Sequence, residues 1–389
     1  MDYLSCPVCK SETLTVAEIH EVGKLLLNDQ WEETIVRGIL ACRKCGQRYP
    51  VLEEAPRLLH PEYLTAAERE VLEKVPGREK RAGPAVQRTP EDLDEFVREI
   101  ILRDYGYPND GPARLRALQE ASYQRTYAEG RRYQMEVLEN LLDSRPKVML
   151  DVGGGTGGNL YAAEAVFELR YGVVADLSSD WPPLFQVGDR RIAYVRADAT
   201  DLPFATARFD LVVSSFLIEH LRLWEAVIAE MARIGRRIFV AFGPNRVFPF
   251  EFGHLDAPLA HCLPQKLGMM VAYLWGRMTG NPRSLDAIKN ILSEMNYMSS
   301  RRFFSYCREM KLCCRNIFPE IAEGRARIAH GRFMIWLGRY PSLTHLLATV
   351  ASGMGIEPNI YALIAPPDNL ALHEMSIRSP SEDAVVGEP

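Results

Sequence analysis

The stretch from Val148 to Leu160 constrains the fold of this chain more than any other. An apolar run ends at Asp151, a turn with five glycines in positions 153–158 follows, and helix-forming residues begin at Asn159. This order predicts a buried strand, a tight loop and a helix. Glycines let a backbone come close to a ligand, at an entropic cost that a function must justify. The loop is therefore expected to hold a ligand.

Two cofactors compete for this loop. Gly153, Gly155 and Gly158 satisfy the G-x-G-x-x-G fingerprint of dinucleotide sites. Asp176 follows at a suitable distance for a ribose hydroxyl. However, the carboxylate of Asp151 at the start of the loop would repel a pyrophosphate. S-adenosylmethionine carries a sulfonium and an ammonium but no phosphate, so the same carboxylate suits it. The sequence favours the methyl donor and leaves a dinucleotide as the alternative.

Further apolar runs alternate with helical patterns, which predicts a doubly wound parallel sheet. These runs begin near residues 171, 193, 209 and 237. The run from 171 ends at Asp176, and the run from 193 leads into Asp198. Ligands of such sheets bind beyond the carboxyl ends of the strands. We therefore expect Asp151, Asp176 and Asp198 to lie at one edge of the sheet.

With these residues in view, the segment 123–366 resembles a class I S-adenosylmethionine-dependent methyltransferase. The resemblance implies a seven-stranded Rossmann-like α/β sheet, with a sixth strand at 311–318 and an antiparallel seventh at 360–365. The family usually has cysteine or another small residue where Gly154 stands, which is a mild departure. The matching pieces are Leu150–Asn159, the Val-Val-Ala-Asp run ending at Asp176, Arg196–Phe204 and Phe209–Leu221.

The same resemblance implies a role for each residue of the donor site. Asp151 and the glycine backbone would hold the methionine end, Asp176 the ribose, and Asp198 with Ala199 the adenine. Ser214 ends the fourth strand; it either joins the donor site or simply terminates that strand. The cofactor-binding candidates are Asp151, Gly153, Gly155, Gly157, Asp176, Asp198, Ala199 and Ser214.

Two C-x-x-C pairs near the N-terminus, Cys6 with Cys9 and Cys42 with Cys45, are separated by 32 residues. Four thiolates form a closed tetrahedral site for one structural zinc ion. Disulfides are the rival interpretation. The absence of a signal-peptide pattern points to a reducing, cytoplasmic compartment and against disulfides. A unit of about 60 residues generally needs such a metal to hold its core.

The end of this unit, Cys45–Leu59, is similar to the Trm112-like zinc-ribbon family. That family usually carries Gly-Ile-Pro where this chain has Glu54-Ala55-Pro56. Related modules occur as partners or fused heads of methyltransferases, so the two resemblances agree. The expected organisation is a zinc ribbon at 1–60, a helical linker region at 61–112, a methyltransferase domain at 113–366 with an insertion at about 319–358, and a disordered tail at 367–389.

Composition limits the acceptor. The net charge of −5 argues against a broad nucleic-acid surface. No apolar run is long enough for a transmembrane helix. Residues 301–339 nevertheless carry nine Lys/Arg against three Asp/Glu. This local excess is either a solvated helix face or a sign of an anionic acceptor or a peripheral membrane contact.

The loop after the fifth strand contains His254, which is the best candidate for a general base because histidine titrates near neutral pH. A structural role for it is about equally expected. His220, at the start of the helix after the fourth strand, is a second candidate, although such a residue more often packs than reacts.

The expected function is methyl transfer from S-adenosylmethionine to a small-molecule, glycan or lipid acceptor, with oxygen as the receiving atom. The alternative is an RNA or protein methyltransferase that uses the ribbon for docking. Against amino-group methylation of bases or glutamine, Ser214-Ser-Phe-Leu217 stands where such enzymes carry an Asn-Pro-Pro-Tyr-like sequence. A non-catalytic scaffold that binds the donor is a third, weaker alternative.

Overall fold

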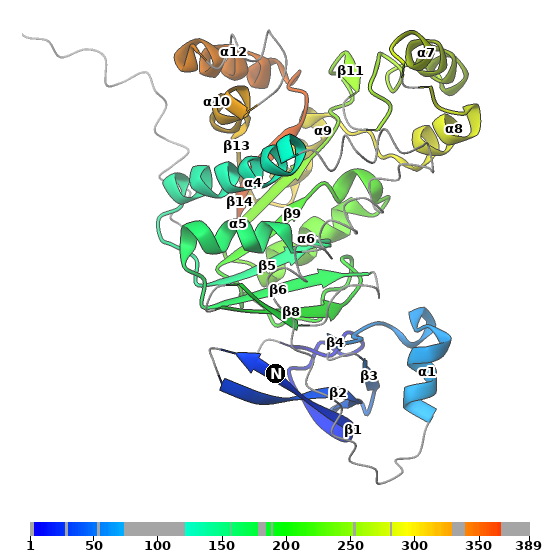
Figure 1. Cartoon of the computed structure of the whole chain (residues 1–389), viewed down its shortest axis with the longest axis vertical. Helices are drawn as coiled ribbons and strands as arrows, with labels where there is room; N and C mark the ends of the chain where they lie inside the picture. The colour runs from blue at the N-terminus through cyan, green and yellow to red at the C-terminus, as the bar shows by residue number, and fades with distance from the viewer. Residues whose placement is uncertain are drawn as a thin grey trace, which may run out of the picture.

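The computed structural model describes residues 4–27, 30–52, 55–73, 121–155, 157–177, 184–187, 190–251, 254–280, 282–328 and 339–366. The largest sheet in these stretches has eight strands in the order β13-β14-β10-β9-β5-β6-β8-β7 (Figure 1). Its strands are β5 (Val148–Val152), β6 (Tyr171–Asp176), β7 (Leu184–Val187), β8 (Arg190–Arg196), β9 (Leu211–Ser215), β10 (Ile238–Phe242), β13 (Cys313–Asn316) and β14 (Ile360–Ala365).

Seven of these strands are those expected from the sequence, and the doubly wound α/β fold is confirmed. β8, β6, β5, β9 and β10 run parallel to one another. β14 runs antiparallel to both β10 and β13, as the resemblance implied. The eighth strand, β7, was not expected. It pairs antiparallel with β8 and extends the edge of the sheet.

Helices cover both faces of the sheet. One face carries α4 (Ala121–Leu141), α5 (Gly158–Phe167), α10 (Phe318–Ile328) and α12 (Pro341–Met354), and the other carries α6 (Trp224–Ile234) and α9 (Ser300–Glu309). Alternation along β9 serves both faces, because Val213 packs toward α5 while Val212 packs toward α6. α4 continues through Gly130 without a break.

An insertion between β10 and α9 lies beyond the carboxyl end of β10. It contains β11 (Phe250–Glu251), β12 (Ala257–Pro258), α7 (Gln265–Met278) and α8 (Leu285–Glu294). Residues 250–294 are called the cap below. The cap has a small core of its own, formed by Leu255, Ala257, Ala260, Ala272 and Ile288. Figure 1 shows it at the upper right, at the opposite end of the molecule from the N-terminal unit.

The N-terminal unit is a four-stranded antiparallel sheet in the order β1-β2-β3-β4. Its strands are β1 (Leu14–Leu27), β2 (Gln30–Cys42), β3 (Arg48–Leu52) and β4 (Ala55–Pro56), followed by the short helix η1 (Pro61–Tyr63) and by α1 (Ala66–Glu73). The predicted tail at 367–389 and the linker beyond residue 73 lie outside the described residues.

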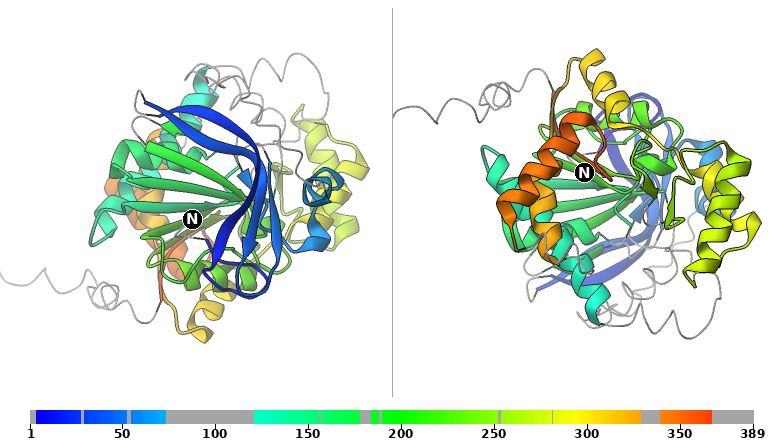
Figure 2. Two further views of the ribbon diagram at one scale, coloured as in Figure 1. Left: turned by 90° about the horizontal axis from the view of Figure 1, so that it is seen from below. Right: turned by 90° about the horizontal axis from the view of Figure 1, so that it is seen from above.

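The N-terminal unit joins the large sheet at its β8 edge. The backbone amide of Leu58 donates to the carbonyl of Arg196 at 3.0 Å, and that of Ser5 donates to Pro203 at 2.8 Å. One buried cluster contains Tyr49 of β3 together with Phe204, which follows β8. Figure 2 (left) shows the blue strands lying across this end of the sheet. The unit therefore shares a core with the domain that follows it.

A buried ion pair fastens this junction. Glu68 of α1 accepts from Arg196 at the end of β8, and both side chains are almost fully buried. Thr65 and Glu68 also form a capping box, in which Thr65 N donates to Oε2 at 2.7 Å and Glu68 N donates to the threonine hydroxyl at 3.3 Å. Burial alone would raise the pKa of Glu68, but the Thr65 amide and Arg196 hold it below its usual value. The carboxylate therefore stays ionised.

We expect Arg196→Met to lower the free energy of unfolding by about 3 kcal/mol, because it leaves a buried carboxylate without its main partner. Chemical denaturation measures this loss. Arg236→Met is the matched control, since Arg236 is mostly exposed and lies 3.7 Å from Asp210. An exposed pair of this kind contributes about 0–1 kcal/mol. Equal losses from both variants would contradict the stabilising role of the buried pair.

Candidate active site and metal centre

The glycine turn between β5 and α5 folds in a way that only glycine tolerates readily. Gly153, Gly155 and Gly157 have φ values of 65°, 51° and 79°, a region where other residues are strained. The turn is held in place because Gly153 N donates to the carbonyl of Ala175 at 2.7 Å and Gly157 N donates to that of Gly154 at 2.8 Å. The result is a closely folded loop above the end of β5.

Asp151 is fully buried beneath this loop. Its Oδ1 accepts from Asn159 Nδ2 at 2.9 Å, while Oδ2 is buried and has no hydrogen-bond partner among the described residues. Burial raises the pKa of Asp151 to about 6, and hydrogen bonding to Asn159 and the charge of Arg131 offset part of that rise. A Cβ at Gly154 would lie 2.6 Å from Oδ2. A side chain at this position would therefore collide with the carboxylate, and glycine avoids that collision.

Asp176, at the end of β6, also contacts the loop. Its Oδ2 accepts from Gly155 N at 3.0 Å. On the other side, the hydroxyl of Tyr194 on β8 donates to the carbonyl of Gly155. Tyr194 is almost fully buried, and burial raises its pKa well above the usual value, so it is a neutral donor. The structure thus brings Asp151 and Asp176 together at one turn, as the sequence suggested.

Asp198 begins the turn after β8. Its Oδ1 accepts from Thr200 N at 2.8 Å and from Thr200 Oγ1 at 2.7 Å. It lines a cavity of about 260 Å³ together with Leu58, His60 and Tyr63 of the N-terminal unit. Ala199 packs at the edge of the neighbouring core. Residues of the N-terminal unit therefore lie beside the turn that carries Asp198 and Ala199.

Ser214 is placed differently from the other donor-site candidates. It is fully buried in β9, and its hydroxyl has no hydrogen-bond partner among the described residues. The next residue, Ser215, points to the opposite face and donates to Asn159 Oδ1 at 3.5 Å. Of the two serines, Ser215 is the one connected to the residues around Asp151.

His254 forms a dyad with Glu251 in the cap. Its Nδ1 lies 2.9 Å from Glu251 Oε1, and Glu251 is completely buried. Burial would raise the pKa of Glu251, but hydrogen bonds from His254 and from the backbone amides of Leu255 and Asp256 keep it below its usual value. An ionised carboxylate at Nδ1 fixes the tautomer that carries its proton there. The Nε2 atom of His254 is then free to accept a proton.

His220 lies beside this dyad, in the short helix η2 (Ile218–His220) that follows β9. The ring centroids of His220 and His254 are 5.5 Å apart in an edge-to-face arrangement. Desolvation and the neighbouring His254 lower the pKa of His220 to about 4, so it is neutral at physiological pH. Leu217, at the start of η2, would meet a Cβ placed at Gly153 at 2.7 Å. Helix η2 therefore connects the dyad to the glycine turn.

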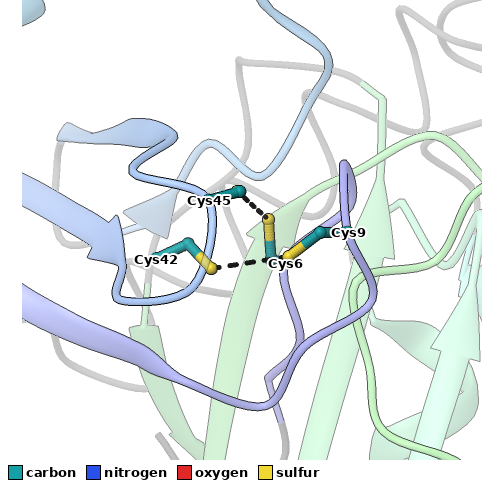
Figure 3. A group of neighbouring side chains, drawn as sticks. All are labelled: Cys6, Cys9, Cys42 and Cys45. Carbon is teal, nitrogen blue, oxygen red and sulfur yellow. Dashed lines mark hydrogen bonds between the residues drawn. The ribbon is translucent and has the colours of Figure 1, made fainter.

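The four N-terminal cysteines converge on one point (Figure 3). Their sulfur atoms all lie within 4.8 Å of one another, and the Cys6–Cys45 and Cys9–Cys42 separations are both 3.6 Å. These separations are far longer than a disulfide bond of about 2.05 Å. They suit thiolates around a tetrahedral ion with metal–sulfur distances of about 2.3 Å. The hydroxyl of Tyr49 on β3 lies 3.0 Å from Cys6 Sγ, within hydrogen-bonding distance.

Several residues of these sites were not identified from the sequence. Asn159 and Arg131, which contact each other at 3.2 Å, neutralise and orient Asp151 from α5 and α4. Tyr194 is joined to the glycine turn only by a long-range contact, for which the sequence holds no local signal. Glu251 could have been found, because an acid three residues before His254 in the same loop is a natural partner for the imidazole.

The part of the chain that forms this turn matches a known family. Residues 150–237 match the family model of a methyltransferase domain. The match covers the glycine turn, Asp176, Asp198 and η2, and ends at the start of β10.

The chain is similar to enzymes of several organisms. It is 30% identical over 138 residues to the ubiquinone/menaquinone biosynthesis C-methyltransferase of Vibrio vulnificus, covering 32% of this chain and 51% of the relative. It is 24% identical over 234 residues to a fatty-acid O-methyltransferase of Mycolicibacterium smegmatis, covering 54% and 80%. Among solved structures, geranyl diphosphate C-methyltransferase from Streptomyces coelicolor aligns at 16% identity with a TM-score of 0.34, covering 60% and 74%. The chain thus spans about half the length of the Vibrio relative.

Metal analysis tests the cysteine cluster. We expect about one zinc ion per chain, because four converging thiolates form a closed site. The double variant Cys42→Ser, Cys45→Ser should lose the ion, since serine is a poor zinc ligand. Cys262→Ser is the matched control, because Cys262 is exposed and lies outside the cluster. Retention of zinc in the double variant would exclude these four cysteines as the metal site.

Proposed function

We propose that the protein transfers a methyl group from S-adenosylmethionine to an oxygen atom of a small-molecule, glycan or lipid acceptor, and that the N-terminal unit holds one structural zinc ion. The observation that carries this proposal is the buried oxygen of Asp151 that has no hydrogen-bond partner among the described residues. A buried carboxylate without a partner is costly, so a cationic ligand at this point would bind favourably.

The donor fits the residues around this oxygen. Asp151 would accept a hydrogen bond from the ammonium group in the methionine moiety of S-adenosylmethionine. The same carboxylate would repel a pyrophosphate. Asp176 would accept from the ribose hydroxyls while it keeps its contact with Gly155. Asp198 retains one carboxylate oxygen for the adenine amino group, because Oδ1 already accepts from Thr200.

The dyad supplies the acceptor chemistry. The donor, when bound, provides an electrophilic methyl carbon on a sulfonium. The acceptor oxygen forms the new bond to this carbon, and the sulfur keeps the electrons of the bond that breaks. His254 takes the hydroxyl proton at Nε2, and Glu251 stabilises the imidazolium that results. Positioning of the two substrates provides most of the rate enhancement, because the reaction is an in-line displacement.

The relatives favour an apolar acceptor. The Mycolicibacterium smegmatis relative is named a fatty-acid O-methyltransferase, and the Vibrio vulnificus relative methylates in ubiquinone and menaquinone biosynthesis. Both names refer to lipid-like compounds, one of them methylated on oxygen. This supports a lipid as the first acceptor class to test for this chain.

The pH dependence of donor binding tests the role of Asp151. Its pKa of about 6 lies above the usual carboxyl value, and a cationic donor requires the ionised form. Affinity should therefore be high at pH 7 and fall as the pH drops through 6, by about tenfold at pH 5. Isothermal titration calorimetry with S-adenosylmethionine measures this change.

Asp151→Asn should weaken binding by about 10- to 100-fold at pH 7 and remove the pH dependence. Asp286→Asn is the matched control, because Asp286 is an exposed carboxylate in the first turn of α8. It should leave both properties unchanged. Tighter binding of NAD than of S-adenosylmethionine to the unmodified protein would overturn the proposal.

Labelled methyl transfer into fractionated cell extract tests the acceptor and the dyad. We expect the label in the lipid or small-molecule fraction. His254→Asn should reduce incorporation by at least about 100-fold, because a general base contributes about 10²–10⁴. The donor affinity should stay within about twofold. His345→Asn, at an exposed position on α12, should be unaffected. Label in RNA or protein would favour the alternative in which the N-terminal unit docks a macromolecule.

A further inference from the structure

The outer face of α7 carries an exposed apolar stripe. Leu267, Met270, Leu274 and Met278 are between 48% and 79% exposed. Their spacing of three and four residues places all four on one side of the helix. An isolated exposed apolar residue is ordinary, but four that line one face of a single helix indicate a contact surface.

This stripe is not needed to hold the helix in place. The opposite face of α7 carries Gly268, Ala272 and Gly276, which are buried. A Cβ at Gly268 would lie 2.2 Å from the carbonyl oxygen of Ala260, so the helix packs very closely against the cap there. The cap core therefore packs against these small residues together with larger ones such as Met269 and Trp275, and the four residues of the stripe stay outside it.

The charges on α7 are all positive. Lys266 and Arg277 are its only charged residues, and both lie beside the stripe. From residue 259 to 294 the chain has four basic and two acidic residues, although the whole protein has a net charge of −5. The guanidinium of Arg277 rests 5.6 Å from the ring centroid of Tyr273 and donates to its hydroxyl at 2.8 Å. Apolar, aromatic and cationic side chains on one helix are typical of helices that bind at a membrane surface.

The position of α7 relates this surface to the acceptor site. The ring of Trp275 on α7 lies 6.2 Å from that of Phe250 on β11 in an edge-to-face contact. Residue 251, next to Phe250, is the carboxylate of the dyad. Figure 2 (right) shows α7 on the end of the molecule that faces away from the N-terminal unit. A membrane that contacts α7 would therefore lie against the cap. The cysteine cluster would remain at the opposite end of the molecule.

A second copy of the chain is a weaker explanation of the stripe. Stable protein interfaces involve roughly 20–30 residues on each side, and the stripe offers four large side chains on one helix. An interface with itself would also bring Lys266 and Arg277 of both copies into one region. A lipid surface needs no matching partner, and anionic headgroups complement these charges.

We propose that α7 docks the protein on an anionic lipid bilayer, with the apolar stripe in the interface and Lys266 and Arg277 at the headgroups. No helix within the described ranges is long and apolar enough to cross a membrane. Docking brings the cap and its dyad to the bilayer, where an apolar acceptor resides. This last step rests on the lipid acceptor proposed above, whereas docking itself does not.

Vesicle sedimentation of the full chain tests the docking. The protein should bind vesicles of phosphatidylcholine with about 30% phosphatidylglycerol, and much more weakly vesicles of phosphatidylcholine alone. Leu274→Glu should reduce binding to the anionic vesicles by at least about tenfold, because it places a carboxylate in the apolar stripe. Arg277→Gln should reduce binding to the anionic vesicles by about fivefold. Raising the salt concentration should also weaken this binding.

Ile19→Glu is the matched control, because Ile19 is 54% exposed in the N-terminal unit at the other end of the molecule. It should leave vesicle binding unchanged. Equal binding of Leu274→Glu and the unmodified protein overturns the proposal. A change of oligomeric state in Leu274→Glu without lipid, measured by sedimentation equilibrium, assigns the stripe to a second copy instead. Val350 lies on the exposed face of α12. If Val350→Glu reduces vesicle binding and Leu274→Glu does not, the lipid-binding surface lies on α12 instead of α7.

These measurements separate docking from methyl transfer. Vesicle binding is measured without the donor, and Leu274→Glu should bind S-adenosylmethionine like the unmodified protein. If docking fails while Asp151→Asn still weakens donor binding as predicted, the proposed activity stands and the lipid surface does not. If the protein does not bind the donor but still binds the vesicles, the lipid surface stands and the proposed activity does not.

Discussion

The candidate active site depends on one buried carboxylate. Asp151 ends a strand at the centre of the sheet, where water does not reach it, and a charge in that position is unfavourable without partners. Asn159 satisfies one of its oxygens, Arg131 supplies opposite charge, and Gly154 carries no side chain that would collide with it. The left-handed glycines of the turn follow from the same requirement, because the chain must pass close over the carboxylate and then enter α5.

The parallel sheet then determines what lies around this carboxylate. β5, β6 and β8 run in the same direction, so Asp151, Asp176 and Asp198 are delivered to one edge. The loops after β9 and β10 lead to the same edge, where His220 lies beside the dyad of Glu251 and His254. Residues that are distant in the chain are thus brought to the same edge of the sheet because the strands that carry them run in the same direction.

The sequence predicted those parts of the structure that have a local pattern. Strands that end in an acid, the glycine turn and the cysteine pairs are readable because each is a short run of particular residue types. β7 also had a local signal, since Gly188-Asp189 separates two short strand-like runs, but it was not recognised. Glu251, three residues before His254, was likewise missed despite a local signal. Other omissions concern contacts between distant segments. Nothing near Tyr194 in the sequence indicates that its hydroxyl would hold the carbonyl of Gly155.

The way in which the N-terminal unit meets β8 has a consequence for self-association. A strand at the edge of a sheet presents unpaired backbone groups, which are a template for pairing with other chains. In this protein β7 pairs with the first part of β8, and residues 57 and 58 pair with its last residue, Arg196. The unit that carries the cysteines thus protects the open side of the sheet. A domain cut at residue 113 would expose that side and bring with it a tendency to aggregate.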